Sequence, residues 1–222
     1  LLQFAASLRE DSGGKPVGVK LCVGHPWEVL ALCKAMLDSG IELDYIVVDG
    51  TEGGTGAAPE EFSDHLGLPL REGLLMVRNA LVGTGLRSRV RLAASGKVYS
   101  AYTLAANMAL GADWCNAARA FMLSLGCVQT KSCHNDRCPT GVATQNPSRQ
   151  RALVVADKAP RVANFQRHTM EHLADIISAA GLDHPGELLP RHLMHRRGTT
   201  ELVTLDKMYE FLEPNVLLEA PD

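Results

Sequence analysis

Tyr45-Ile46-Val47-Val48-Asp49 is a run of aromatic and β-branched residues that passes directly into a glycine-rich loop, residues 50–59. A strand that is apolar at nearly every position is typical of a parallel sheet covered on both faces. Residues 26–38 before it and 70–82 after it carry apolar residues at helical spacing. Pro26 suits the first turn of the earlier helix, and Gly40 suits its end. The order helix, strand, helix predicts βα units around a parallel sheet.

The same unit recurs on both sides of this run. Further strands are expected at residues 17–22, 90–94 and 114–117, and further helices at 100–110 and 118–125. Four successive βα units predict an α/β fold of the (β/α)8 TIM-barrel type, of which this chain is about the C-terminal half. A doubly wound open sheet is the alternative, but no G-x-G-x-x-G follows any of these strands.

Three regions follow from this pattern. Residues 1–126 are expected to form a partial (β/α) barrel, 127–145 a cysteine loop, and 146–222 a C-terminal helical segment packed on the barrel. Within the last region, helices are expected at about 164–180, 186–197 and 205–212. An open half-barrel exposes two strand edges and part of its apolar interior. We therefore expect it to be completed by the missing barrel half or by another copy of the chain.

Composition narrows the class of protein. The chain has 222 residues, 46% hydrophobic and 21% charged, with a net charge of −3, which is typical of a soluble globular protein. The sequence contains no run of Lys and Arg residues, so nucleic acid is not expected as a partner. No apolar stretch approaches the roughly 20 residues that a membrane helix requires. The chain opens on Leu1 without a signal peptide, which suggests a cut inside a longer protein and a cytoplasmic location.

Three of the six cysteines lie within twelve residues of a polar loop, in the spacing Cys127-x5-Cys133-x4-Cys138 followed by Pro139. Such a cluster indicates metal binding or redox chemistry more than a structural disulfide. Three thiolates suit a [3Fe-4S] cluster, and a proline after the last ligand is also found in ferredoxin motifs. Zinc remains an alternative, although zinc sites normally use four ligands at closer spacing. The remaining cysteines lie in apolar runs and are expected to be buried and inert: Cys22, Cys33 and Cys115.

Three motifs together resemble the glutamate synthase family. Residues 126–145 are similar to that family's iron–sulfur loop, C-x5-C-x4-C-P-x-G-V-A-T-Q. Residues 49–59 resemble its G-G-T-G-A-x-P loop, and Val19-Lys20-Leu21 resembles its barrel strand with an active-site lysine. The order and distances of the three elements also agree, and the similarity runs from about residue 17 to 197.

The resemblance implies a flavoenzyme that binds FMN and 2-oxoglutarate beside a [3Fe-4S] cluster ligated by Cys127, Cys133 and Cys138. In the family, ammonia from glutamine adds to 2-oxoglutarate to give 2-iminoglutarate, and reduced FMN then delivers hydride to make glutamate. The cluster passes electrons to the flavin from a donor that the sequence does not identify, and the chain alone is expected to be inactive. Two other interpretations stay open: a non-catalytic half-barrel interaction module with a structural zinc or cluster site, and a related flavin oxidoreductase with another substrate.

Lys20 is the catalytic candidate, because a charged side chain inside a barrel requires a partner and barrel chemistry occurs at the carboxyl ends of the strands. Asp49 or Glu52 could orient it, although both residues are more commonly turn caps. The alternative for Lys20 is a side chain that extends outward to solvent. His25 is a candidate acid or base on the basis of its position alone. It lies in residues 22–27, where the sequence differs from that of the large bacterial glutamate synthases.

The loops after the last two strands are the candidate phosphate site for FMN, since glycine amides and helix N-termini favour phosphate. Here the family commonly reads D-G-G, whereas this chain reads Ala94-Ser95-Gly96. A simple turn is the alternative for this stretch. The glycine-rich loop is too long for a hairpin turn and is expected to lie against substrate or flavin. The cofactor-binding candidates are Ser95, Gly96, Lys97, Ala118, Arg119, Gly53, Gly54 and Thr55.

Overall fold

A computed structural model describes residues 1–53 and 61–219 of the chain. Four parallel strands form its main sheet in the order β1-β2-β3-β4. They are β1 (Gly18–Leu21), β2 (Tyr45–Asp49), β3 (Arg91–Ser95) and β4 (Trp114–Asn116). The connecting helices are α2 (Pro26–Ser39), α3 (Leu70–Gly83) and α4 (Ala101–Ala109), and α5 (Ala118–Leu125) follows β4. The prediction of four successive βα units is therefore confirmed.

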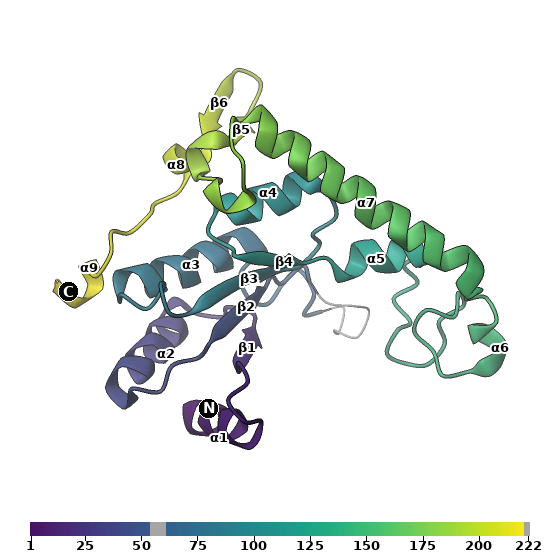
Figure 1. Ribbon diagram of the computed structural model, residues 1–222, viewed down its shortest axis with the longest axis horizontal. Coiled ribbons are helices and arrows are strands. Elements are labelled where there is room, and N and C mark those ends of the chain that lie inside the picture. The colour runs from purple at the N-terminus through teal and green to yellow at the C-terminus, as the bar shows by residue number, and fades with distance from the viewer. Residues whose placement is uncertain (54–60, 220–222) are drawn as a thin grey trace.

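The two faces of the sheet carry different residues. Ile46, Val48 and Ala94 belong to the same buried core as apolar residues of α2, α3 and α4, and Figure 1 shows these helices following one another along one side of the sheet. Val47 and Ala93 alternate with them, as strand pleating requires, and lie outside that core. The register places Lys20 and Trp114 beside them on this second face.

The sheet has two open edges in the part of the chain that the structure describes. β1 pairs only with β2, and β4 pairs only with β3. An α/β arrangement of four parallel strands with helices on one side is compatible with part of a (β/α) barrel. Residues 1–53 and 61–219 do not close a barrel by themselves.

An N-terminal helix, α1 (Leu2–Asp11), precedes the sheet and was absent from the sequence prediction. It buries only Leu2 and Ala5, which gives a weak amphipathic signal. Arg9 ties it to the loop before β2 through an ion pair with Asp44 at 2.7 Å and a hydrogen bond to the Glu42 carbonyl oxygen. Polar anchoring of this kind leaves no periodic trace in a sequence.

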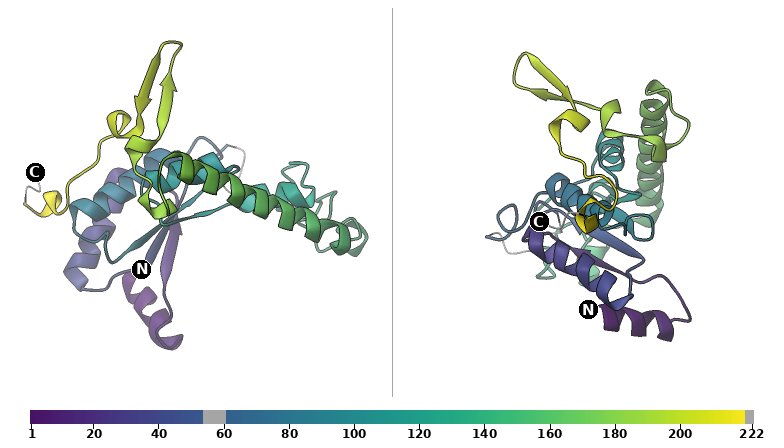
Figure 2. Two further views of the ribbon diagram at one scale, coloured as in Figure 1. Left: turned by 45° about the horizontal axis from the view of Figure 1, so that its top comes forward. Right: turned by 90° about the vertical axis from the view of Figure 1, so that its left-hand side faces the viewer.

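The C-terminal region contains a long helix that crosses the α4–α5 side of the sheet (Figures 1 and 2). α6 (Pro147–Gln150) precedes α7 (Val155–Ala179), which begins nine residues earlier than about residue 164 and contains Pro160. Phe165 packs edge-to-face on Phe121 of α5, with ring centroids 5.3 Å apart. This contact helps to hold α7 against the sheet domain.

The predicted helix at 186–197 is wrong. Pro185 and Pro190 begin two short 3-10 turns, η1 (Pro185–Glu187) and η2 (Pro190–His192), because proline suits a first turn but interrupts a longer helix. They lead into β5 (Met194–Arg197), which pairs antiparallel with β6 (Glu201–Thr204). The hairpin projects from the body of the molecule in Figure 2.

Only one turn of the predicted helix at 205–212 is present, as α8 (Leu205–Met208). The chain then runs in extended form along α3 to α9 (Val216–Glu219). Among residues 1–53 and 61–219, no helix is both long and apolar enough to cross a membrane.

Candidate active site

An ion pair joins two neighbouring strands near the carboxyl edge of the sheet. Lys20 Nζ lies 2.6 Å from Asp49 Oδ2, with the lysine side chain 56% exposed and the aspartate side chain 15% exposed. The other carboxylate oxygen, Asp49 Oδ1, is buried and accepts no hydrogen bond from the described residues. Buried polar atoms are nearly always paired, so this oxygen marks a place where a donor is required.

Glycines bring the backbone close to Asp49 on two sides. A Cβ on Gly53 would collide with Asp49 Oδ1, and a Cβ on Gly96 would lie 3.4 Å from the same atom. Gly96 has φ +127°, a conformation that favours glycine. The Gly50 N–H donates to the Ser95 carbonyl oxygen at 3.0 Å, which joins the loops after β2 and β3. Three candidate segments therefore meet at this edge, whereas Gly54 and Thr55 lie outside the described residues.

The candidate phosphate loops leave the same edge, because Ser95 and Asn116 are register partners at the ends of β3 and β4. Ser95 is buried, and Lys97 lies 3.3 Å from Asp64. Ala118 and Arg119 are the first two residues of α5, whose N-terminus receives no side-chain cap. An uncapped helix N-terminus beside close glycine backbone fits a phosphate group such as that of FMN.

Two other candidates near this edge have structural roles. The Glu52 carboxylate accepts the Leu70 N–H at 3.0 Å and so caps α3. His25 is the N-cap of α2, and its N–H donates to Glu28 at 2.9 Å. The His25 ring stacks on Trp27 with centroids 4.1 Å apart. Of the two acidic residues considered as partners of Lys20, Asp49 is the one that contacts it.

The cysteine loop follows α5, and it stabilises a thiolate at Cys138. Burial alone would raise the pKa of this thiol, but hydrogen bonds from the Thr140 hydroxyl and from backbone N–H groups, including those of Ala143 and Val142, lower it to about 7. A backbone N–H, that of Gln129, also lies 3.5 Å from Cys127 Sγ. Thiol ligands with N–H donors are chemically suited to an iron–sulfur cluster.

The three thiols of this loop are not gathered into a ligand set. In the described part of the chain, no three His, Cys, Asp or Glu side chains lie close enough together to hold a metal ion. Cys138 is buried, whereas Cys127 and Cys133 are half-buried. The donor types fit a cluster, but the loop would have to rearrange to bring all three sulfurs onto it.

The other cysteines differ in burial. Cys33 is buried, as predicted, whereas Cys115 is only half-buried, and desolvation by burial raises the pKa of the Cys115 thiol to about 12. Cys22 is exposed, so the prediction that it is buried is wrong. It stands just beyond the end of β1, where the chain has left the sheet. None of the three belongs to the cysteine loop.

Comparison with known proteins matches residues 1–183 to the conserved region in glutamate synthase. The chain belongs to the glutamate synthase family. It is 41% identical over 208 residues to the glutamate synthase large subunit-like protein YerD of Bacillus subtilis, covering 94% of this chain and 39% of that protein. It is 35% identical over 184 residues to the archaeal glutamate synthase (NADPH) of Methanocaldococcus jannaschii, covering 82% of this chain and 35% of that protein.

The chain is also 35% identical over 148 residues to the glutamate synthase (NADPH) large chain of Bacillus subtilis, covering 67% of this chain and 10% of that protein. The chain thus spans well under half the length of these glutamate synthases.

Sequence reasoning did not identify the approach of Gly53 and Gly96 to Asp49. The signal for it was a strand that ends in aspartate, with glycines in the loops after two adjacent strands.

Proposed function

We propose that this chain forms part of the catalytic domain of a glutamate-synthase-type oxidoreductase. The enzyme would make glutamate from 2-oxoglutarate and an amino group that glutamine supplies as ammonia. The observation that carries this proposal is the Lys20–Asp49 pair at the carboxyl edge of the sheet, with glycine backbone packed around the carboxylate. The names of the similar proteins support the same reaction.

Lys20 can act directly on a keto acid. Its side chain is more than half exposed, and its ammonium group can donate hydrogen bonds to a carboxylate or carbonyl oxygen while Asp49 restrains it from one side. Donation to the carbonyl oxygen favours addition of ammonia to the carbonyl carbon. Loss of water then gives 2-iminoglutarate, and addition of a hydride to carbon and a proton to nitrogen gives glutamate.

Reduced FMN would supply that hydride when bound. We infer that its phosphate is held by the loops of Ser95, Gly96 and Lys97 and by the first turn of α5, at Ala118 and Arg119. The support is their common position at one edge of the sheet and the uncapped helix N-terminus. Gly53 would border the substrate and the flavin ring.

A [3Fe-4S] cluster on Cys127, Cys133 and Cys138 would relay electrons to the flavin. Its support is the donor types and the thiolate-stabilising amides at Cys138. The remaining parts of the enzyme are the rest of the barrel, or another copy of the chain, and an electron donor of unidentified kind. We propose that the enzyme is cytoplasmic and that this segment, by itself, is inactive.

The test is iron and acid-labile sulfide analysis with an EPR spectrum, after anaerobic purification or reconstitution. We expect about three irons per chain and an oxidised [3Fe-4S] signal. Cys133→Ala should lose that signal, and Cys22→Ala, outside the loop and exposed, should keep it. About one zinc per chain without sulfide would instead favour the non-catalytic half-barrel module with a structural metal.

A further inference from the structure

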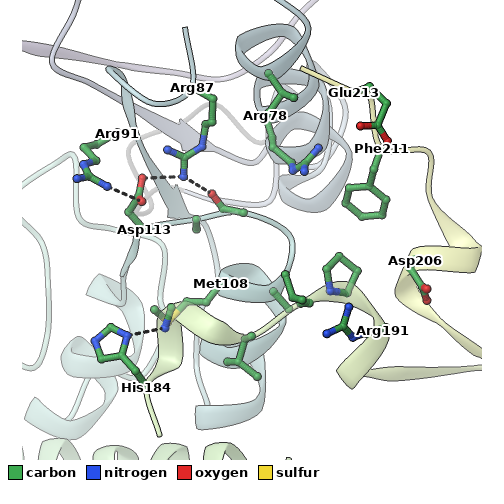
Figure 3. A pocket seen from close by; sticks show the side chains of 18 residues that line it. Arg78, Arg87, Arg91, Met108, Asp113, His184, Arg191, Asp206, Phe211 and Glu213 are labelled. Carbon is green, nitrogen blue, oxygen red and sulfur yellow. Dashed lines mark hydrogen bonds and ion pairs between the residues drawn. The ribbon is translucent and has the colours of Figure 1, made fainter. Parts of the chain in front are cut away.

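A separate cavity of about 1040 Å³ lies at the opposite, amino-terminal edge of the sheet. Arg91 opens β3 and Asp113 directly precedes β4, whereas the candidate active site lies where these strands end. One wall of the cavity is formed by α3, the start of β3, the end of α4 and the turn before β4. Residues 184–213 form the other wall (Figure 3).

Two arginines of this cavity contact a carboxylate of the protein itself. Asp113 accepts hydrogen bonds from Arg87 at 2.9 Å and from Arg91 at 3.3 Å, and also from the Leu92 N–H at 2.7 Å. Arg87 donates in addition to the Gly111 carbonyl oxygen at 3.0 Å. Both guanidinium groups therefore share the carboxylate of Asp113, and their hydrogen bonds are directed at the protein and not into the cavity.

Arg78 is in a different situation. Its half-buried guanidinium lies 4.9 Å from the centroid of the Phe211 ring and donates to the neutral Asn79 side chain at 2.8 Å. No described carboxylate makes an ion pair with it. Burial, and then the neighbouring Arg87 cation, lower the pKa of Arg78, and Glu213 opposes them from a distance. A partly desolvated cation with only a neutral hydrogen-bond acceptor favours an anion.

Arg191 provides a second cation on the other wall. It is exposed in η2 and makes no hydrogen bond or ion pair with any described residue. Figure 3 shows Arg78 and Arg191 extending into the cavity from opposite walls. Apolar side chains line the space beside them: Val82, Met108, Leu188 and Leu189.

We propose that this cavity binds a small organic anion, with its phosphate or carboxylate group between Arg78 and Arg191 and its apolar part against Met108, Leu188 and Leu189. Guanidinium groups match both oxyanions in geometry, and the volume is of the order of known ligand pockets, roughly 300–1,000 Å³. The ligand would join α3 to the C-terminal segment. This site does not depend on the reaction proposed above.

Calorimetric titration of the full-length protein, in a buffer free of other multivalent anions, tests the proposal with AMP, glutarate and inorganic phosphate. At least one organic anion should bind saturably and more tightly than inorganic phosphate, because its apolar part is buried as well. AMP against glutarate distinguishes a phosphate from a carboxylate ligand. Arg191→Gln should weaken binding at least about tenfold, since it removes a charge-assisted hydrogen bond. Arg161→Gln, exposed on α7 and outside the cavity, should leave the affinity unchanged.

Two further variants distinguish a loss of binding from a loss of folding stability. Arg78→Gln should also weaken binding, and its melting temperature reports any loss of the packing on Phe211. Glu213→Gln should strengthen binding several-fold, because it removes a negative charge near Arg78. The proposal is overturned if neither AMP nor glutarate binds saturably. Unchanged affinity in both arginine variants, or phosphate binding as tight as either organic anion, overturns it too.

Discussion

Asp49 has two carboxylate oxygens in different surroundings. Oδ2 pairs with Lys20, whereas Oδ1 is buried against the glycine loops without a described donor. A buried acceptor without a partner destabilises a protein by about 1–3 kcal/mol. Binding of a group that donates a hydrogen bond to Oδ1 would remove this penalty, and it would also weaken the electrostatic attraction between Asp49 and Lys20. We therefore regard Asp49 as a positioning residue through which a bound ligand and the lysine are coupled.

Replacement of Lys20 by Met should abolish glutamate formation in the complete enzyme while the iron–sulfur signal remains. The reason is that the variant loses the hydrogen-bond donor nearest the proposed substrate position. Steady-state turnover measured beside the EPR spectrum tests this. Lys34→Met, on the exposed surface of α2, is the matched control. Wild-type turnover in the Lys20 variant would exclude this residue from the site.

Gly96 and Gly40 provide a comparison of two glycines with positive φ. Gly40 has φ +67°, and a Cβ there would meet no atom within 4 Å, so Gly40→Ala should cost only about 1 kcal/mol of unfolding free energy. Gly96 has φ +127°, and a Cβ there would lie 3.2 Å from Gly50 N. Gly96→Ala should cost more, about 2–3 kcal/mol. Equal shifts of the two denaturation midpoints would show that the loops after β2 and β3 separate easily.

At the level of elements, α1 contacts the loop before β2 through the ion pair of Arg9 with Asp44, in addition to burying Leu2 and Ala5. Burial raises the pKa of this carboxyl group, but the hydrogen bond from the Val17 N–H and the contacts with Arg9 outweigh burial and lower the pKa overall. A carboxylate whose folded-state pKa is depressed stabilises the protein above its unfolded-state pKa. That contribution is lost as the pH falls through the folded-state value.

Asp44→Asn should therefore be less stable than the wild type at neutral pH, and the difference should shrink as the pH falls below about 4. Hydrogen exchange of the α1 amides and chemical denaturation, both measured between about pH 3 and pH 7, test this. Asp38→Asn, in an exposed pair with Lys34, should show little pH-dependent difference. A constant gap between the Asp44 variant and the wild type would contradict the assigned cause.

The elements that the sequence predicted well are those with a strong local pattern. β2 and α5 have the predicted bounds, and α3 differs by one residue, because apolar periodicity and flanking glycine or proline mark them. The segment 186–197 was wrongly predicted because the apolar residues between Pro185 and His195 fit a helix as well as they fit turns and a strand. Its structure depends on pairing with β6, which lies later in the chain.

The candidate site was predictable to a similar degree. The strand ends placed Lys20, Ser95 and the start of α5 at one edge, since parallel strands present their carboxyl ends together. The choice between Asp49 and Glu52 as partner of Lys20 depended on where the loop turns, and Glu52 caps α3 instead. The cysteine spacing indicated the kind of ligand set, but whether three sulfurs meet depends on the conformation of the whole loop.

At the scale of the whole molecule, the face of the sheet that carries Lys20 and Trp114 includes an exposed aromatic residue on an edge strand. Trp114 is 37% exposed at the edge strand β4 and packs edge-to-face on Tyr45, with centroids 5.9 Å apart. Within residues 1–53 and 61–219, neither β4 nor β1 has a second strand to pair with. Unpaired edges beside an exposed aromatic residue favour association with further strands.

We therefore expect the 222-residue chain, expressed by itself, to self-associate in sedimentation equilibrium at micromolar concentration. Trp114→Lys should shift it toward the monomer, because a charge on this face opposes burial against another sheet. Trp27→Lys is the matched control: Trp27 is 64% exposed but lies on helix α2 and not on an edge strand, so its replacement should leave association unchanged. A wild-type chain that remains monomeric at all concentrations would show that the open sheet is stable without further strands.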